Sequence, residues 1–158
     1  MTDQPTPDDV ALWQRRLASQ ANNRAWTLAE SLQRSPEEDE EMLQAAHAAM
    51  YFWKMVGTPS HHANAALLLA HAYALLKLPR PARHYLSKSL RYFEEHDGLP
   101  WEMAFFHAVA ANVASAEGDE AAHAKQYAEA QAAASRMTDS ETRAMFAATW
   151  RVIPVPRH

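Results

Sequence analysis

Residues 64–94 decide the fold: they read NAALLLAHAYALLKLP from Asn64 to Pro79 and RPARHYLSKSLRYFE from Arg80 to Glu94. Apolar and small side chains recur at helical spacing on both sides of the prolines. The first stripe is Leu69, Ala70 and Tyr73, and the second is Ala82, Leu86, Ser89 and Phe93. The pattern predicts two amphipathic helices joined by a short turn.

Small residues at Ala70 and Ala82 let the two helix backbones approach closely, and Tyr73 and Leu86 fill the remaining space. This order of large and small residues resembles a tetratricopeptide repeat. Six positions match: Leu69, Ala70, Tyr73, Ala82, Leu86 and Ser89. Two depart, since Ala66 stands where the repeat has a bulky aromatic and Lys77 where it has a turn glycine.

The pattern recurs about 40 residues further on, a longer period than the usual 34 or so. Val109, Ala110 and Val113 repeat Leu69, Ala70 and Tyr73, and Ala122 repeats Ala82. Two longer blocks, residues 45–53 and 99–107, resemble a set of uncharacterised bacterial tetratricopeptide-like proteins. That resemblance implies an all-α, TPR-like α-solenoid of about three antiparallel helical hairpins plus a C-terminal capping helix. It implies no activity.

Length and composition agree with an all-α fold. The chain has 158 residues, 48% hydrophobic and 22% charged, with only three glycines, so we expect one globular domain over residues 1–158. Residues 1–5 are expected to fray at the N-terminus. Residues 152–158 are expected to form an extended tail, because Pro154 and Pro156 prevent a helix.

Most helix boundaries can be located from capping residues. Thr6, Ser35 and Thr58 each precede a proline and predict helix starts. The expected helices cover about 7–33, 36–56, 59–78, 79–96, 100–117, 119–137 and a short one to Trp150. Gly57 is predicted as a left-handed cap, Asp97-Gly98 as the end of the fourth helix, and Thr138 as the start of the last. The first helix is expected to bury Val10, Trp13, Leu17, Ala21, Leu28 and Leu32.

Charge and composition exclude several classes of function. The net charge is -4 and the basic residues are scattered, so no nucleic-acid partner is expected. The absence of cysteine excludes disulfides and thiolate chemistry. The longest apolar run, residues 65–70, is too short to cross a membrane, and the polar N-terminus lacks a signal peptide. We expect a cytoplasmic protein.

No motif indicates catalysis. Nine histidines are present, but the Glu-x-x-His spacing of di-iron bundles occurs only once, at Glu120–His123. There is no His-Glu-x-x-His sequence, glycine-rich phosphate loop or Gly-x-Ser-x-Gly elbow. We therefore predict no metal, no cofactor and no catalytic residue, and an enzyme is the less favoured reading.

The predicted site is the concave groove lined by the first helix of each hairpin. Its candidate residues are His47, Tyr51, Asn64, His71, Trp101 and His107. The first hypothesis is an interaction module that binds an unknown peptide, a partner helix or a second copy through this groove. Under this hypothesis the groove is open, and exposed end faces make a homodimer plausible. The alternative is a ligand-binding or enzymatic protein with a closed pocket lined by His47, Tyr51, His71 and His107. The competing interpretation of these residues is structural: core packing for Trp101, and hydrogen-bonded or half-exposed histidines for His71 and His107.

Overall fold

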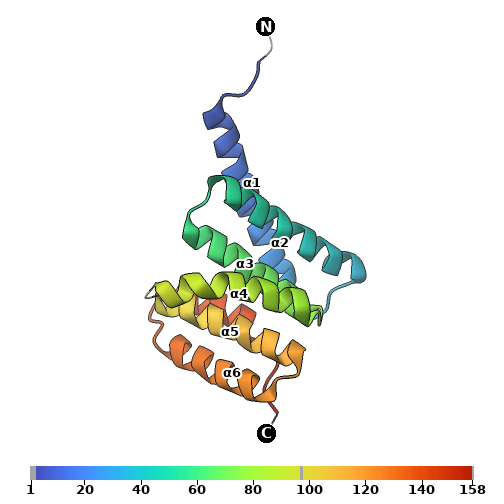
Figure 1. Ribbon diagram of the computed structural model, residues 1–158, viewed down its shortest axis with the longest axis vertical. Helices are drawn as coiled ribbons and strands as arrows, with labels where there is room; N and C mark the ends of the chain where they lie inside the picture. Colours follow the sequence, from blue (N-terminus) through green and yellow to red (C-terminus); the bar gives the residue numbers. More distant parts are fainter. Residues whose placement is uncertain (1–2, 97, 158) are drawn as a thin grey trace.

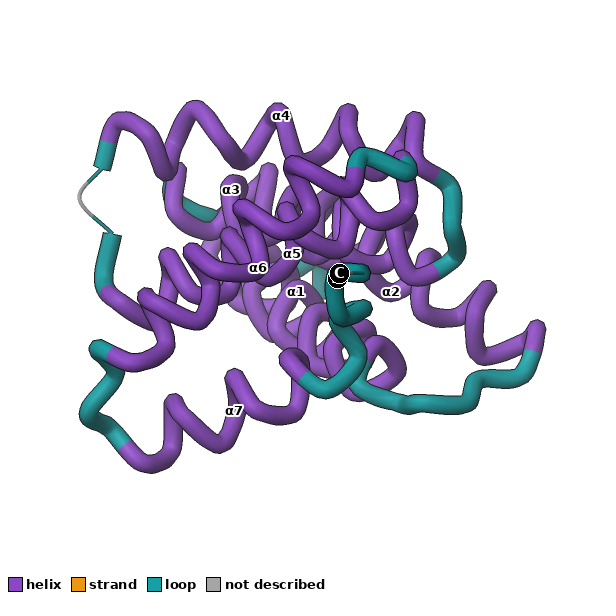
Figure 2. The backbone as a smooth tube through the Cα atoms, turned by 90° about the horizontal axis from the view of Figure 1, so that it is seen from below, coloured by secondary structure: helices purple, strands orange, loops and turns teal. Residues whose placement is uncertain are grey.

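The computed structural model describes residues 3–96 and 98–157, which form seven α-helices (Figure 1). The helices are α1 (Pro7–Ala29), α2 (Pro36–Val56), α3 (Pro59–Leu75), α4 (Pro79–Glu95), α5 (Pro100–Glu117), α6 (Glu120–Ser135) and α7 (Ser140–Trp150). Figure 2 shows the short loops that join them. No helix in the described part of the chain is long and apolar enough to span a membrane.

Three antiparallel hairpins form the body of the molecule, as predicted. They are α1 with α2, α3 with α4, and α5 with α6, and the helices of each pair contact one another more extensively than any other two helices do. The odd-numbered helices also contact one another in series, since α3 packs on both α1 and α5, and α5 packs on α7. Helices α2 and α4 each pack on the helix that follows them.

The core lies around α3 and α5, which are buried on nearly all sides. Ala70 and Ala82 are fully buried where α3 meets α4, and Leu86 packs into the same cluster. The two apolar stripes of residues 64–94 therefore meet in the fold, where α3 packs on α4. Close packing through alanine is what allows these helices to approach.

The predicted helix starts at Thr6, Ser35 and Thr58 are confirmed. Each side chain accepts a hydrogen bond from the backbone N–H three residues later, at 3.1, 3.1 and 3.5 Å. The last helix differs from its prediction, because its cap is Asp139 and not Thr138. Asp139 accepts from the Thr142 N–H at 2.8 Å.

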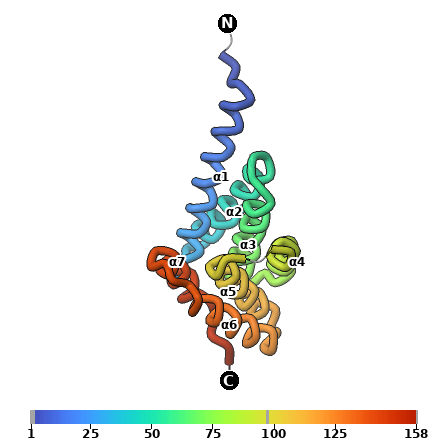
Figure 3. The backbone as a smooth tube through the Cα atoms, turned by 90° about the vertical axis from the view of Figure 1, so that its left-hand side faces the viewer, coloured from blue at the N-terminus to red at the C-terminus, as the bar shows by residue number. Residues whose placement is uncertain are grey.

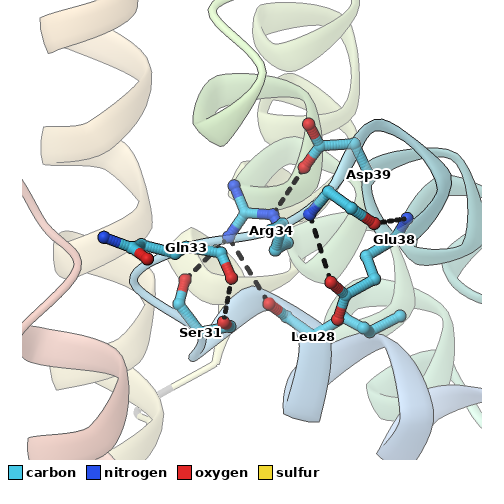
Figure 4. A network of polar contacts seen from close by, with 7 residues as sticks. Leu28, Ser31, Gln33, Arg34, Glu38 and Asp39 are labelled. Atoms are coloured by element: carbon cyan, nitrogen blue, oxygen red, sulfur yellow. Dashed lines mark hydrogen bonds and ion pairs between the residues drawn. The ribbon is translucent and has the colours of Figure 1, made fainter.

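The first helix ends at Ala29 and not near Gln33, because Arg34 stabilises a turn there (Figure 4). Its Nη1 donates to the carbonyls of Leu28 at 3.4 Å and Ser31 at 3.0 Å, and its Nε donates to Asp39 at 2.7 Å. The guanidinium thus adds hydrogen bonds to the Leu28 carbonyl, which also accepts from the Ser31 N–H at 3.2 Å, and to the Ser31 carbonyl, and it ties this turn to the start of α2.

Three further helix ends differ from the sequence predictions. Helix α3 ends at Leu75 rather than Leu78, because Lys77 adopts a left-handed conformation with φ 58°. Gly57 is extended and not left-handed, with φ -85°. Glycine suits this position for a different reason, since a Cβ atom added here would lie 2.6 Å from the Trp53 carbonyl oxygen. Helix α6 stops at Ser135, two residues early.

The expected buried face of α1 is wrong for its N-terminal half. Val10 is 36% exposed, Trp13 51% and Leu17 45%, and Leu32 beyond the helix is 69% exposed. Figure 3 shows this half of α1 extending past the helices that cover the rest of it. Only further along, at Ala21 and Leu28, is the predicted face covered by the body.

The described residues at the two chain ends lie outside the helices, with a turn at residues 151–153 before the C-terminal tail. Residues 3–6 precede α1 without regular structure, whereas the predicted fraying of residues 1–2 lies outside the described residues. The C-terminal tail packs on the body through Ile153, which is buried, and the Pro154 carbonyl oxygen is hydrogen-bonded to His123 Nε2 at 2.7 Å. His158, like the predicted stop at Asp97, lies outside the described residues.

Candidate binding site

A cavity of about 590 Å³ lies among the odd-numbered helices. It is lined by Asn22, Asn23, Trp26, Thr27 and Glu30 from α1 and its end, by Asn64 and Leu67 from α3, by Trp101 and Phe105 from α5, and by Thr142, Met145 and Thr149 from α7. No residue of α2, α4 or α6 contributes. The lining residues of each helix are mostly three or four apart, so each helix presents one face to the cavity.

Aromatic rings form one wall of this pocket. Phe105 lies between two indoles in edge-on contacts, with ring centroids 5.8 Å from Trp26 and 6.4 Å from Trp101. Leu67 is buried at the base, whereas Trp101 and Met145 are exposed at the rim. The pocket is therefore open to solvent and largely apolar inside.

Seven of the twelve lining residues are polar, and one of them has no hydrogen-bond partner. Thr149 is 1% exposed, and its Oγ1 makes no hydrogen bond within the described residues. A buried hydroxyl without a partner costs about 1–3 kcal/mol. The hydroxyl has no exposed surface in this structure, so its hydrogen-bonding capacity is unused although the residue borders the pocket.

Glu30 is the one charged residue in the lining. Burial raises the pKa of its carboxyl, an effect that the nearby Arg151 partly opposes. Arg151 Nη2 donates to the Glu30 backbone carbonyl at 3.1 Å and so links the ends of α7 and α1. The lining itself contains no cation, so the pocket is not built to hold a carboxylate.

His71 lies behind Trp26, with ring centroids 5.6 Å apart, and is fully buried. Asn112 Nδ2 donates to His71 Nδ1 at 3.2 Å, which puts the ring proton on Nε2, an atom without a partner in the described structure. Burial, with a smaller effect of the Arg34 charge, lowers the pKa of His71 to about 3. The imidazole is therefore neutral at pH 7.

The six predicted site residues fall in different places. Asn64 and Trp101 line the pocket. His71 supports Trp26 from behind. His107 Nδ1 is hydrogen-bonded to Gln126 Oε1 at 2.7 Å.

The remaining two are on α2. His47 Nε2 is hydrogen-bonded to Tyr73 Oη at 2.8 Å, and burial lowers the pKa of His47. Tyr51 is 60% exposed and packs edge-on against Phe52. None of His47, Tyr51, His71 and His107 lines the pocket between the odd-numbered helices.

The contributions of α1 and α7 to the pocket were not predicted from the sequence. On α1 the sequence does show one pattern: the polar residues lie on the side opposite Leu28. They are Asn22, Asn23, Thr27 and Glu30. A polar stripe is typical of any helix face that is turned away from the core, so it does not by itself predict a pocket wall. No group of three or more His, Asp or Glu side chains within the described ranges is placed to bind a metal ion.

Comparison of the chain with protein-family models, with curated proteins and with solved structures gives no match. An all-helical protein of seven described helices packed as hairpins is what the structure establishes. The resemblance to tetratricopeptide-like proteins thus rests on the sequence pattern alone.

Proposed function

We propose that this protein is a TPR-like interaction module, and that the pocket among the odd-numbered helices binds an apolar or aromatic side chain of a peptide or partner helix. The observation that carries the proposal is that every lining residue belongs to an odd-numbered helix, α1, α3, α5 or α7, apart from Glu30, which directly follows α1. In an α-solenoid the first helices of successive hairpins line the inner face, which is the usual binding surface.

Matching helix ends support the repeat arrangement. Lys77 and Gly118, which follow α3 and α5, both adopt left-handed conformations, with φ 58° and 75°. In each case the next residue's N–H donates to a carbonyl five residues earlier, Leu78 to Tyr73 and Asp119 to Ala114, both at 3.0 Å. Two hairpins with the same turn geometry are expected of repeated units.

The chemistry of the pocket favours an apolar anchor. Its volume lies within the range of ligand pockets, about 300–1,000 Å³, and buried aromatic walls typically dominate binding energy at interfaces. Because no cation lines it, the partner is expected to present an internal side chain rather than a C-terminal carboxylate. Glu30 would favour a neighbouring basic residue in the peptide.

A small molecule is the second candidate, and the unpartnered Thr149 Oγ1 favours it. Such a ligand would place an apolar body against Trp26 and Phe105 and, after rotation of the Thr149 side chain brings its hydroxyl to the pocket surface, a hydrogen-bonding group at Thr149. Thr149→Val tests it: removal of the hydroxyl should weaken a hydrogen-bonding ligand but leave a peptide bound through an apolar side chain unaffected.

A phage-displayed random peptide library tests the main proposal. Wild-type protein should enrich peptides that share an aromatic or large aliphatic residue, and Thr27→Trp, which fills the mouth of the pocket, should bind them at least about tenfold more weakly. Ser87→Trp on α4 is a matched control. Both replaced hydroxyls are exposed and donate to the carbonyl four residues earlier at 2.9 Å. Equal binding by both variants, or no enrichment by wild type, would refute the proposal.

A further inference from the structure

The first three turns of α1, residues 7–17 (the N-terminal arm), carry an apolar stripe that nothing in the described structure covers. Val10, Trp13 and Leu17 are between 36% and 51% exposed, and the first buried residue of α1 is Ala18. In Figures 1 and 3 the arm extends away from the other helices. None of the three stripe residues lines the pocket.

The arm is nevertheless built as a stable helix start. Thr6 and Asp9 form a reciprocal capping box at 3.0 and 3.1 Å, and Pro7 occupies the first position. The arm is continuous with the packed second half of the 23-residue α1, so it does not have to be stable as an isolated short helix. A well-capped arm with an uncovered tryptophan therefore has the features of one half of a helix–helix interface.

The stripe has the spacing of a two-helix seam. Val10, Trp13 and Leu17 are separated by three and four residues, as at the apolar positions of a coiled coil. Asp9 and Arg16 lie one heptad apart and flank the same side of this stripe. Charges at such flanking positions set the orientation of the two helices.

We propose that the arms of two copies of this chain pair antiparallel to form a symmetric homodimer. In this arrangement Val10 of one copy lies beside Trp13 of the other, and Asp9 of each copy faces Arg16 of the other. In a parallel pair, a residue at such a flanking position faces the residue five positions further along the other helix, so Asp9 would face Gln14 and Arg16 would face Ala21, and neither charge would meet an opposite one. Charge complementarity therefore selects the antiparallel arrangement and a second copy as the occupant.

The size of the arm sets the expected strength of this dimer. Two three-turn helices bury less than the roughly 1,200–2,000 Å² of a standard interface. The dimer is thus expected to dissociate on dilution, with a dissociation constant on the order of 1–100 μM.

Sedimentation velocity over a concentration series tests the dimer. The wild-type mass should rise from that of one 17.8 kDa chain to twice that value. Leu17→Asp should remain a single chain at all concentrations. Leu12→Asp is the matched control, because Leu12 is equally exposed, at 42%, on the opposite face of the same helix, and it should dimerise like wild type.

Circular dichroism establishes that both variants fold. A wild-type protein that stays a single chain throughout, or equal loss of dimer in both variants, would overturn the proposal. Neither result would bear on peptide binding in the pocket, so this inference and the proposed function fail separately.

Cross-linking tests the orientation, and the chain has no cysteine to interfere. With a short bis-maleimide, Val10→Cys should link two copies, because the two cysteines lie near the two-fold axis. Leu17→Cys should not, because antiparallel pairing separates its two cysteines by about 16 Å along the helix at 1.5 Å per residue. Links at both positions would show parallel arms, and links at neither would show unpaired arms; either result would overturn the antiparallel dimer.

Discussion

His71 should make the stability of this protein depend on pH between about 7 and 3. Burial lowers the pKa of the folded-state imidazole from 6.5 to about 3. The unfolded chain therefore takes up a proton below pH 6.5 that the folded protein does not bind. Stability is highest above pH 6.5 and falls as the pH decreases.

The magnitude follows from that shift. Each pH unit in the window costs up to about 1.4 kcal/mol, so the free energy of unfolding should fall by about 2 kcal/mol between pH 7 and pH 5 through this residue alone. The whole window corresponds to roughly 5 kcal/mol. The lowered pKa of His47 acts in the same direction, so the effect of His71 must be isolated by difference.

Urea denaturation at pH 5, 6, 7 and 8 measures this effect. His71→Gln can still pair with Asn112 but does not titrate, so its stability should fall by about 2 kcal/mol less than that of wild type from pH 7 to pH 5. His84→Gln replaces an exposed histidine and should keep the wild-type dependence. If His71→Gln retained the full pH dependence, the buried neutral imidazole would be refuted.

Five further substitutions, which form three tests, probe the local structure by the same denaturation assay. Lys77→Gly should stabilise the fold by about 1 kcal/mol, because it removes a left-handed lysine, and Gly118→Ala should cost a similar amount; the opposite signs would contradict the assigned turns. Arg34→Met should cost about 1–3 kcal/mol through lost carbonyl contacts, whereas Arg24→Met should leave the stability nearly unchanged because its ion pair with Glu41 is exposed; equal losses would argue against the Arg34 turn. Gly57→Ala should destabilise by about 1–3 kcal/mol through the collision of its Cβ with the Trp53 carbonyl, and an unchanged stability would show that the loop has room to move.

Helix starts were predictable because their signals are local. Ser35 and Glu38 satisfy each other's backbone groups within four residues, and this is visible in the sequence. The ends of α2 at Val56 and α5 at Glu117 were also predicted, because a glycine follows each of them. The ends of α1 and α3 were not, because they depend on contacts made elsewhere. Arg34 ends α1 through carbonyls and a carboxylate of two helices, and Lys77 takes a conformation that glycine usually adopts.

The pocket was predictable only in part, for the same reason. Asn64 and Trp101 follow from the hairpin pattern, because they lie on the first helices of two adjacent hairpins. The contributions of α1 and α7 depend on the chain ends coming together, as the bond between Arg151 and the Glu30 carbonyl shows. Burial of His71 follows from the packing of Trp26 over it, which helical periodicity does not specify.

The central claim is that the pocket among the odd-numbered helices is the binding surface, and the tryptophan indole N–H signals test it directly. The chain has five tryptophans, of which Trp26 and Trp101 line the pocket and Trp13, Trp53 and Trp150 do not. In a ¹H–¹⁵N NMR titration with a library-selected peptide, assigned by single Trp→Phe variants, the account predicts that the Trp26 and Trp101 signals shift while the other three stay in place. Shifts confined to Trp13, Trp53 or Trp150 would contradict it.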